Sequence, residues 1–345
     1  MKKLVLLLIL LSLLITSACS SKEDEVIEEE PQVEAEAIEE EVEDAPDYTN
    51  ISIFNGQGID DDQNSYQALG IMIENHEGAR PHSGLGLADI VYEMAVETYT
   101  ITRFMAIFAS QHPDKIGPVR SARIPFVHMI QEWGLPYAYY GAAARDHGDA
   151  RSLISSLNIP IRFDGDQGDN DEFYFRDNSR RSPHNAFFNG EAALSKIPDL
   201  EYEEHFKYGK ETNINQGESS KVSLSYSSSN HTSYEYDPDN NNYLRFINNE
   251  PMMDIYTDEQ IRVKNIILQE APHRMLGRDN YVLVDFIGQG KAGYFIDGIY
   301  EEGTWSKDSY ESKTEYFNSQ GNPIILLPGN TWIQVIHNRV EIEIE

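Results

Sequence analysis

The chain has 345 residues, of which 58 are acidic and 27 are lysine or arginine, so its formal charge is -31 at neutral pH. A composition that is 40% hydrophobic and 11% aromatic is typical of a globular protein, which excludes bulk disorder, collagen-like chains and multi-spanning membrane proteins. The acidic excess argues against general nucleic-acid binding, which needs a clustered basic surface. A single cysteine, Cys19, excludes an internal disulfide and a cysteine-based zinc site.

The N-terminus has the pattern of a secretory signal. Lys2 and Lys3 precede an apolar run from Leu4 to Ile15, which is shorter than the roughly 20 residues of a membrane-spanning helix. The small residues just before Cys19 look like a bacterial lipobox. We therefore expect residues 1–19 to be a lipoprotein signal peptide, and Cys19 to be lipidated and to anchor the chain on the extracytoplasmic face of the cell membrane. An ordinary secretory signal is the alternative.

Residues 20–50 form an acidic segment. The segment holds much of the charge excess, including the runs Glu28–Glu30 and Glu39–Glu41, and contains little apolar material. Such a composition cannot bury enough surface to offset the entropy of ordering, so it predicts a disordered, self-repelling tether. A helix is the alternative. Repulsion from an anionic membrane surface would hold the folded part away from the bilayer.

Residues 51–190 mix strand and helix signals. Ile90–Glu97 alternates with a period of two, and Arg103–Ala109 is a buried-strand run, so the two predict an antiparallel hairpin that turns within Thr98–Thr102. A helix is expected to begin near Ile124 and Pro125, because proline is tolerated in a first helical turn. Its apolar stripe would be Val127, Ile130 and Trp133, and a strand at Tyr137–Tyr140 and a helix at Ala142–Leu157 would follow.

The second half has mainly strand signals. Residues 191–229 are polar and are expected to connect two domains, with an edge strand at Lys221–Tyr226. Residues 230–345 predict a β-rich domain of short strands joined by Gly, Pro and Asn turns. The whole predicts an α+β protein: a mixed α/β N-terminal domain and a β-rich C-terminal one. The expected C-terminal strands are Tyr234–Tyr236 with Tyr243–Ile247, Arg262–Leu268, Tyr281–Ile287 joined to Ala292–Ile296 by Gly288–Lys291, and Ile324–Leu327 joined to Thr331–Ile336 by Pro328–Asn330.

Arginine is strongly preferred over lysine in one interval. Ten arginines lie between Arg80 and Arg181, where Lys115 is the only lysine. This preference indicates bidentate pairing, either with carboxylates of the fold or with an anionic ligand. Arg120 and Arg123 would lie where a loop enters a helix, a suitable place for an anion. The candidate anion site consists of Arg80, Arg103, Arg120, Ser121, Arg123, His147, His184 and Asn185, with Asp89, Glu93 and Glu97 as acidic partners.

Motifs for catalysis are weak. Neither His147 nor His184 has a second histidine four residues on, and neither Ser121 nor Ser182 lies in a nucleophile elbow, so no zinc site and no serine hydrolase is predicted. Counted from Asp164, the acidic stretch Asp164–Glu172 has no glycine at the sixth position, where an EF-hand loop turns, and no glutamate follows at the twelfth. We predict no catalytic residue and no cofactor, and leave open a divalent cation near Asp89 or Glu93.

Eight strings of the sequence are typical of one known family: Ile71–His76, Ala79–Pro81, Gly84–Glu97, Ile101–Ser110, Ile116–Arg123, Pro183–Asn185, Gly303–Lys307 and Leu327–Ile333. They resemble the YerB-like lipoproteins, a Gram-positive family of domains of unknown function. The resemblance implies a lipid anchor, a mixed α/β N-terminal domain and a β-rich C-terminal domain, and it assigns no catalytic residue. One departure is Gly141-Ala-Ala, where relatives tend to have a Gly-Gly-Ser-like stretch.

The layout of residues 101–125 is also similar to that of the LytR-CpsA-Psr phosphotransferases, whose arginines grip a polyprenyl pyrophosphate. Two hypotheses follow. The first is a membrane-tethered, non-catalytic binding module that contacts a cell-wall ligand or an envelope protein. The second is a transferase or binder of polyprenyl-pyrophosphate-linked glycans that uses Arg103, Arg120 and Arg123, with Asp89 or Glu93 near a divalent cation.

Overall fold

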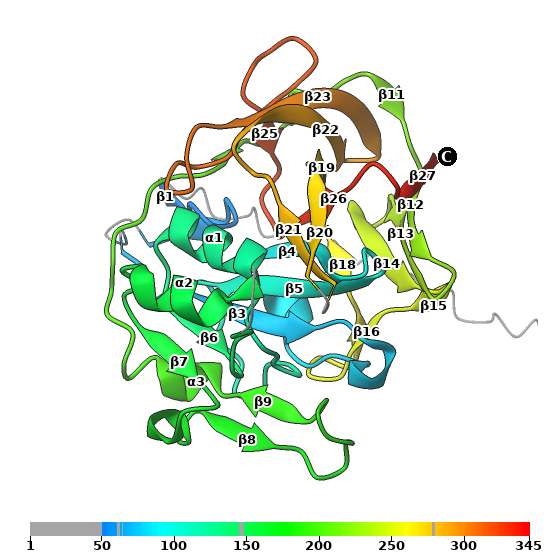
Figure 1. Cartoon of the computed structure of the whole chain (residues 1–345). Coiled ribbons are helices and arrows are strands. Elements are labelled where there is room, and N and C mark those ends of the chain that lie inside the picture. The colour runs from blue at the N-terminus through cyan, green and yellow to red at the C-terminus, as the bar shows by residue number, and fades with distance from the viewer. Residues whose placement is uncertain (1–49, 61–62, 64, 145–147, 278–279) are drawn as a thin grey trace, which may run out of the picture. The chain divides into compact units, whose positions relative to one another are not determined.

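Strands dominate the folded part of the chain (Figure 1). The computed structural model describes residues 50–60, 63, 65–144, 148–277 and 280–345, so Cys19 and the expected tether up to residue 49 lie outside it. About 45% of the chain is strand and 10% is helix, which makes the fold β-rich and the expected α+β class wrong. The helices among the described residues are α1 (Ile124–Trp133), α2 (Ala150–Ser156) and α3 (Gly190–Ala193), and none of them is long and apolar enough to cross a membrane.

One sheet of 13 strands runs through both halves of the sequence. Its centre is β26, which pairs in parallel with β4 on one side and with β19 on the other, so a strand of the second half completes the sheet of the first. The strands follow the order β11 (Gly217–Glu218), β23 (Ile299–Lys307), β22 (Gly288–Ile296), β19 (Asn265–Glu270), β26 (Thr331–Ile336), β4 (Ile90–Glu97), β5 (Ile101–Phe108), β3 (Leu69–Glu74), β6 (Tyr137–Tyr139) and β7 (Arg162–Asp164), and β20 (His273–Leu276), β21 (Tyr281–Val284) and β24 (Glu315–Phe317) attach at its side.

A second sheet has six strands and belongs to the second half of the chain. It contains β15 (Glu250–Pro251), β14 (Asn242–Ile247), β13 (Asn230–Asp237), β12 (Lys221–Ser227) and β27 (Glu341–Ile344) in that order, with β18 (Arg262–Val263) beside β14. The remaining strands form pairs: β1 (Asn50–Ile51) with β2 (Gly58–Ile59), β8 (Tyr174–Arg176) with β9 (Ala186–Phe188), β10 (Lys207–Tyr208) with β25 (Ile325–Leu326), and β16 (Met253–Asp254) with β17 (Glu259–Gln260).

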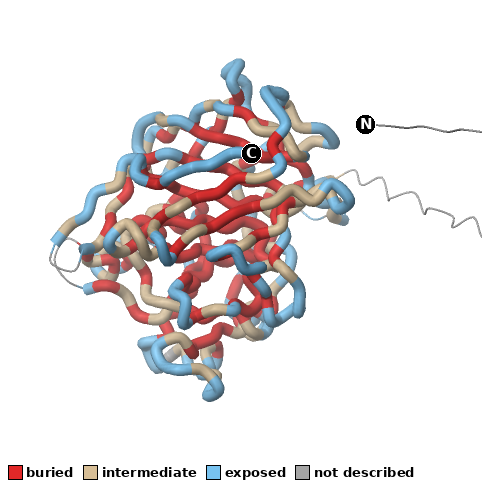
Figure 2. The backbone as a smooth tube through the Cα atoms, turned by 90° about the vertical axis from the view of Figure 1, so that its right-hand side faces the viewer, coloured by how far each residue is buried: buried red, intermediate tan, exposed pale blue. Residues whose placement is uncertain are grey.

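The central sheet is covered on both faces, which explains why its middle strands are buried throughout (Figure 2). Tyr92 of β4 packs in one core with the α1 residues Phe126 and Trp133. The preceding residue, Val91, lies on the other face and packs in a second core with Tyr234 and other side chains of the six-stranded sheet. Because consecutive strand residues point to opposite faces, β4 needs apolar side chains on both, and a polar one among them must find a partner inside.

The local predictions for the first half are largely confirmed. β4 and β5 form the expected antiparallel hairpin, with Thr98 and Tyr99 at positive φ in its turn. Helix α1 begins at Ile124 with proline in its first turn and ends at Trp133, and Gly134 caps it with a φ of 64°, which glycine adopts without strain. The expected helix at 142–157 is shorter, since α2 spans Ala150–Ser156, and residues 145–147 lie outside the described chain.

Three predicted arrangements in the second half are wrong. Strand β12 is not an edge, because β13 and β27 flank it. Gly288–Lys291 is the beginning of β22, which pairs with β19 and β23, and not a turn between two paired strands. The strands on either side of Pro328–Asn330 do not pair with each other, because β26 enters the central sheet. In each case a strand pairs with a segment distant in the sequence: β12 with β27, β22 with β19, and β26 with β4.

Candidate functional site

Three of the predicted arginines meet two glutamates where neighbouring strands end. Glu74 ends β3, Glu97 ends β4, and Arg103 lies in the adjacent β5. Arg103 Nε lies 3.9 Å from Glu74 Oε1, and its Nη2 lies 3.6 Å from Glu97 Oε1. Arg120 Nε pairs with Glu74 Oε2. Arg123 Nη2 lies 2.5 Å from Glu97 Oε1. We call these five residues the arginine–glutamate cluster.

The cluster is mostly enclosed. Arg103 and Glu74 are 2% and 3% exposed, whereas the side chains of Arg120 and Glu97 reach solvent, at 29% and 23%. Burial, together with neighbouring Arg123, lowers the pKa of Arg103 to about 10, so Arg103 is still a cation at neutral pH. Burial alone would raise the pKa of Glu97, but Arg103 and Arg123 hold it below its ordinary value. Three arginine cations therefore face two glutamates, and Arg120 and Glu97 are the members of the cluster that solvent reaches most.

Ser121 contributes to the cluster mainly through its backbone. Its carbonyl oxygen accepts hydrogen bonds from Arg103 Nη1 at 2.6 Å and from Arg123 Nη1 at 3.4 Å. Its hydroxyl donates to the Tyr140 carbonyl at 2.9 Å. The loop does enter α1 as the sequence predicts, with Arg123 as the residue before the helix. The arginines of this loop, however, bind carboxylates and carbonyls of the fold.

Two further residues of the predicted site, His184 and Asn185, have different partners. His184 lies beside the cluster, with its Nδ1 3.3 Å from Glu74 Oε2 and its ring stacked on His76 at 5.0 Å between centroids. Asn185 is buried and its Oδ1 accepts a hydrogen bond from Arg176 at 2.8 Å. His147 lies outside the described residues.

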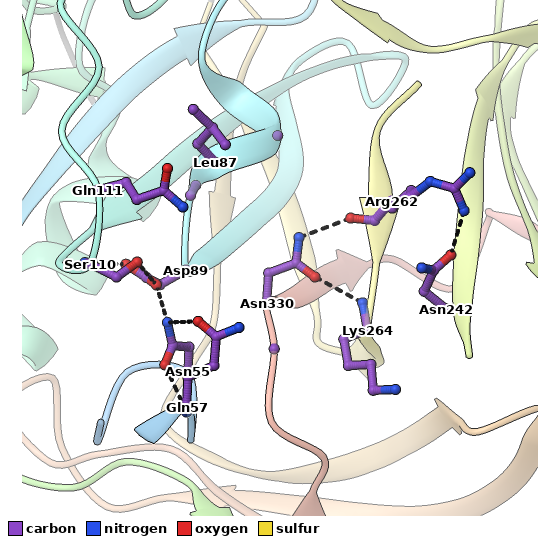
Figure 3. A pocket seen from close by; sticks show the side chains of 13 residues that line it. Asn55, Gln57, Leu87, Asp89, Ser110, Gln111, Asn242, Arg262, Lys264 and Asn330 are labelled. Carbon is purple, nitrogen blue, oxygen red and sulfur yellow. Dashed lines mark hydrogen bonds between the residues drawn. The ribbon is translucent and has the colours of Figure 1, made fainter. Parts of the chain in front are cut away.

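Asp89 lies beneath a small polar pocket, where protein donors occupy its oxygens (Figure 3). Oδ2 accepts the backbone N–H groups of Ala109 at 2.7 Å and Ser110 at 2.9 Å. Oδ1 accepts the Ser110 hydroxyl and the Asn55 amide, both at 2.6 Å. A carboxylate with four accepted hydrogen bonds has no lone pair free for a cation. Asp89 therefore fixes the end of the hairpin strands.

Glu93 is fully buried and is also saturated. Its Oε2 lies 2.7 Å from Arg245 Nη2 and 2.9 Å from Gln334 Nε2. Its Oε1 accepts hydrogen bonds from Asn75 at 2.9 Å and Thr102 at 2.7 Å. The Glu93–Arg245 ion pair, with both side chains at 0% exposure, links the hairpin of the first half to the six-stranded sheet of the second.

Sequence reasoning missed Arg245 and Glu74. Arg245 lies between Tyr243 and Ile247 at every second position of β14, so the three side chains share the buried face of the strand. Glu74 ends the apolar run Leu69–Glu74, so a carboxylate at the end of a buried strand was visible beside the arginines. Either residue could have been found by assuming that a charged side chain in an apolar strand pattern has a partner inside the fold.

Comparison with known families matches both halves of the chain. Residues 54–203 match the N-terminal domain, and residues 222–333 the C-terminal domain, of the protein family of unknown function DUF3048. The chain belongs to the DUF3048 family. It is 28% identical over 280 residues to the Bacillus subtilis (strain 168) protein named "Putative lipoprotein YerB", covering 78% of this chain and 80% of that protein. The crystal structure of the YerB protein from Bacillus subtilis matches 85% of this chain and 99% of its own, with a TM-score of 0.74 and 25% identity.

Arg80 lies in a separate pocket where the two DUF3048 domains meet. The pocket has a volume of about 300 Å³. Arg80 donates from Nη2 to the Asn75 carbonyl at 2.7 Å and from Nε to Asn75 Oδ1 at 3.3 Å. The N-terminal domain supplies Asn75, His76, Glu77, Arg80, Thr100, Ile101 and Thr102, and the C-terminal domain supplies Ser229 and Asn230. The predicted arginines therefore do not converge on one open cleft.

Proposed function

We propose that this DUF3048 protein is a lipid-anchored binding module of the cell envelope, held on the extracytoplasmic face of the membrane, with no chemistry of its own. The N-terminal pattern that ends at Cys19 supports the anchor, as does the similarity to a relative named as a lipoprotein. The acidic segment 20–50 would serve as the spacer between membrane and folded part. The ligand would be a component of the cell wall or an envelope protein.

The observation that carries the non-catalytic part of this proposal is the pairing inside the arginine–glutamate cluster. Transfer of a group from an anionic carrier needs cations that can approach the carrier's charge. Arg103 and Arg123 instead contact Glu97 and the Ser121 carbonyl. The carboxylates that a divalent cation would need, Asp89 and Glu93, accept four hydrogen bonds each. These charges hold strand ends and loops together, which is what a rigid binding module requires.

Replacing Cys19 with serine is expected to release the protein from the membrane. A serine hydroxyl offers no thiol for lipid attachment, and two acyl chains are what make such an anchor stable. In a Gram-positive host, wild type should sediment with membranes, and Cys19→Ser should appear in the culture medium or as an unprocessed precursor. Ser21→Ala, two residues on, is the matched control and should stay with the membranes. Cys19→Ser that is cleaved like wild type and still sediments with membranes would contradict the anchor.

The alternative of a polyprenyl-pyrophosphate transferase or binder rests on Arg120, because this side chain is 29% exposed at the edge of the cluster. We expect calorimetry of the detergent-solubilised chain with an undecaprenyl pyrophosphate analogue to give no saturable heat. Arg120→Ala tests the cluster, and Arg274→Ala, an exposed arginine paired with Asp285, is the control. Binding that Arg120→Ala abolishes and Arg274→Ala preserves would favour the alternative over a non-catalytic module.

A further inference from the structure

The pocket at the junction of the two DUF3048 domains has a rigid, buried floor. Asn75, Thr102 and Asn230 are 3%, 1% and 6% exposed. Asn75 Nδ2 donates to Thr102 Oγ1 at 2.8 Å and to Glu93 Oε1 at 2.9 Å. These bonds tie the floor to the buried Glu93–Arg245 ion pair, so its polar groups are held in place before any ligand arrives.

Arg80 presents an unused donor edge to this pocket. Asn75 holds its Nε and Nη2, while no described residue accepts a hydrogen bond from its Nη1 or forms an ion pair with it. Glu93, the carboxylate whose charge favours the Arg80 cation most, is already bound to Arg245. Burial lowers the pKa of Arg80, which means that the fold stabilises this cation less well than water does. An anion in the pocket would restore that stabilisation.

Asn230 supplies a hydrogen-bond acceptor, whereas Arg80 supplies donors. Its Nδ2 donates to the Thr100 carbonyl at 3.0 Å, but its buried Oδ1 has no partner. A buried acceptor without a donor is unfavourable, so a ligand N–H that donated to it at the pocket floor would stabilise the complex. The pocket therefore offers a planar cation and a buried acceptor, supplied by different domains.

We propose that this pocket binds the C-terminal end of a peptide, with Arg80 holding the α-carboxylate and Asn230 accepting the adjacent amide N–H. This deepens the proposed function and rests on it. A guanidinium fork matches a carboxylate in geometry. A singly charged carboxylate fits better than a doubly charged phosphate, because Glu77, exposed at the rim, repels the phosphate more strongly. About 300 Å³ lies at the small end of ligand pockets and suits one or two terminal residues.

The test is a ligand-observed NMR titration of the full chain in detergent with N-acetyl-alanyl-alanine. The free acid is expected to bind, and its C-terminal amide to bind at least about tenfold more weakly, because the charge-assisted hydrogen bonds are lost. Arg80→Ala should weaken binding of the acid by a similar factor, and Arg274→Ala should not. Ser229→Trp, on the exposed rim, should block the pocket while leaving Arg80 and the floor intact, which covers the case that Arg80→Ala does not fold.

The two peptide sources are separated by stereochemistry. Preference for the all-D dipeptide assigns the pocket to cell-wall peptide ends, and preference for the all-L form assigns it to protein C-termini. Equal binding of acid and amide, equal binding of inorganic phosphate, or no binding at millimolar peptide overturns the inference. These failures leave the membrane fractionation of Cys19→Ser untouched, so they are distinguishable from a failure of the proposed function.

Discussion

Replacing Arg245 with methionine is expected to destabilise the fold by about 3–5 kcal/mol, since removal of one partner leaves a buried charge unpaired. Glu93 would keep the hydrogen bonds from Asn75, Thr102 and Gln334 but would lose its only cation at ion-pair distance among the described residues. The guanidinium also lies over the rings of Trp332 at 4.6 Å, Tyr234 at 5.0 Å and Phe104 at 5.6 Å, and these cation–π contacts are lost as well.

Urea unfolding of wild type, Arg245→Met and Glu93→Gln measures this effect, with Arg274→Met as the surface control that should leave the midpoint unchanged. The double variant Glu93→Gln with Arg245→Met should recover part of the loss, because it removes both charges. If Arg245→Met unfolded at the same urea concentration as wild type, the pair would not connect the two DUF3048 domains energetically. If both single variants lost stability as expected, the ion pair would be shown to stabilise the fold.

The local elements of this chain could be predicted from the sequence, whereas the pairing of distant strands could not. The β4–β5 hairpin and α1 could be predicted because period-two alternation, an early proline and a final glycine act within a few residues. The insertion of β26 between β4 and β19 could not, because the hydrophobic pattern of Thr331–Ile336 fits a local pair equally well. Because both halves contribute strands to this one sheet, the protein has a β-rich fold in place of the predicted mixed α/β domain followed by a β-rich domain.

The candidate site shows the same division. The arginine preference pointed correctly to a region rich in ionic contacts, but spacing along the chain could not tell which carboxylates would meet them. Among the acidic residues singled out, Glu97 contacts Arg123, whereas Glu93 pairs with Arg245 from the other domain. Arg80, grouped with the other arginines by sequence, faces a different pocket. Only the fold decides whether an arginine meets an acid or an opening.

A second buried ion pair should be about as costly to break. Lys307 of β23 places its Nζ 2.8 Å from Glu132 Oε2 of α1, with the two side chains at 0% and 1% exposure. We expect Lys307→Met to lose about 3–5 kcal/mol, because Glu132 would remain buried without its cation. Lys313→Met is the matched control: its partner Glu203 is on the surface, and exposed pairs contribute no more than about 1 kcal/mol.

The response to a double substitution should distinguish this pair from the first. Glu132 Oε1 also accepts the backbone N–H of Thr314 at 2.7 Å, and replacing the glutamate with methionine would leave that donor buried and unpaired. Lys307→Met with Glu132→Met should therefore recover little stability in urea unfolding. Lys307→Met with Glu132→Gln should recover more, because the amide oxygen can still accept from Thr314. If the two double variants were equally stable, the Thr314 bond would contribute nothing, and the carboxylate would serve Lys307 alone.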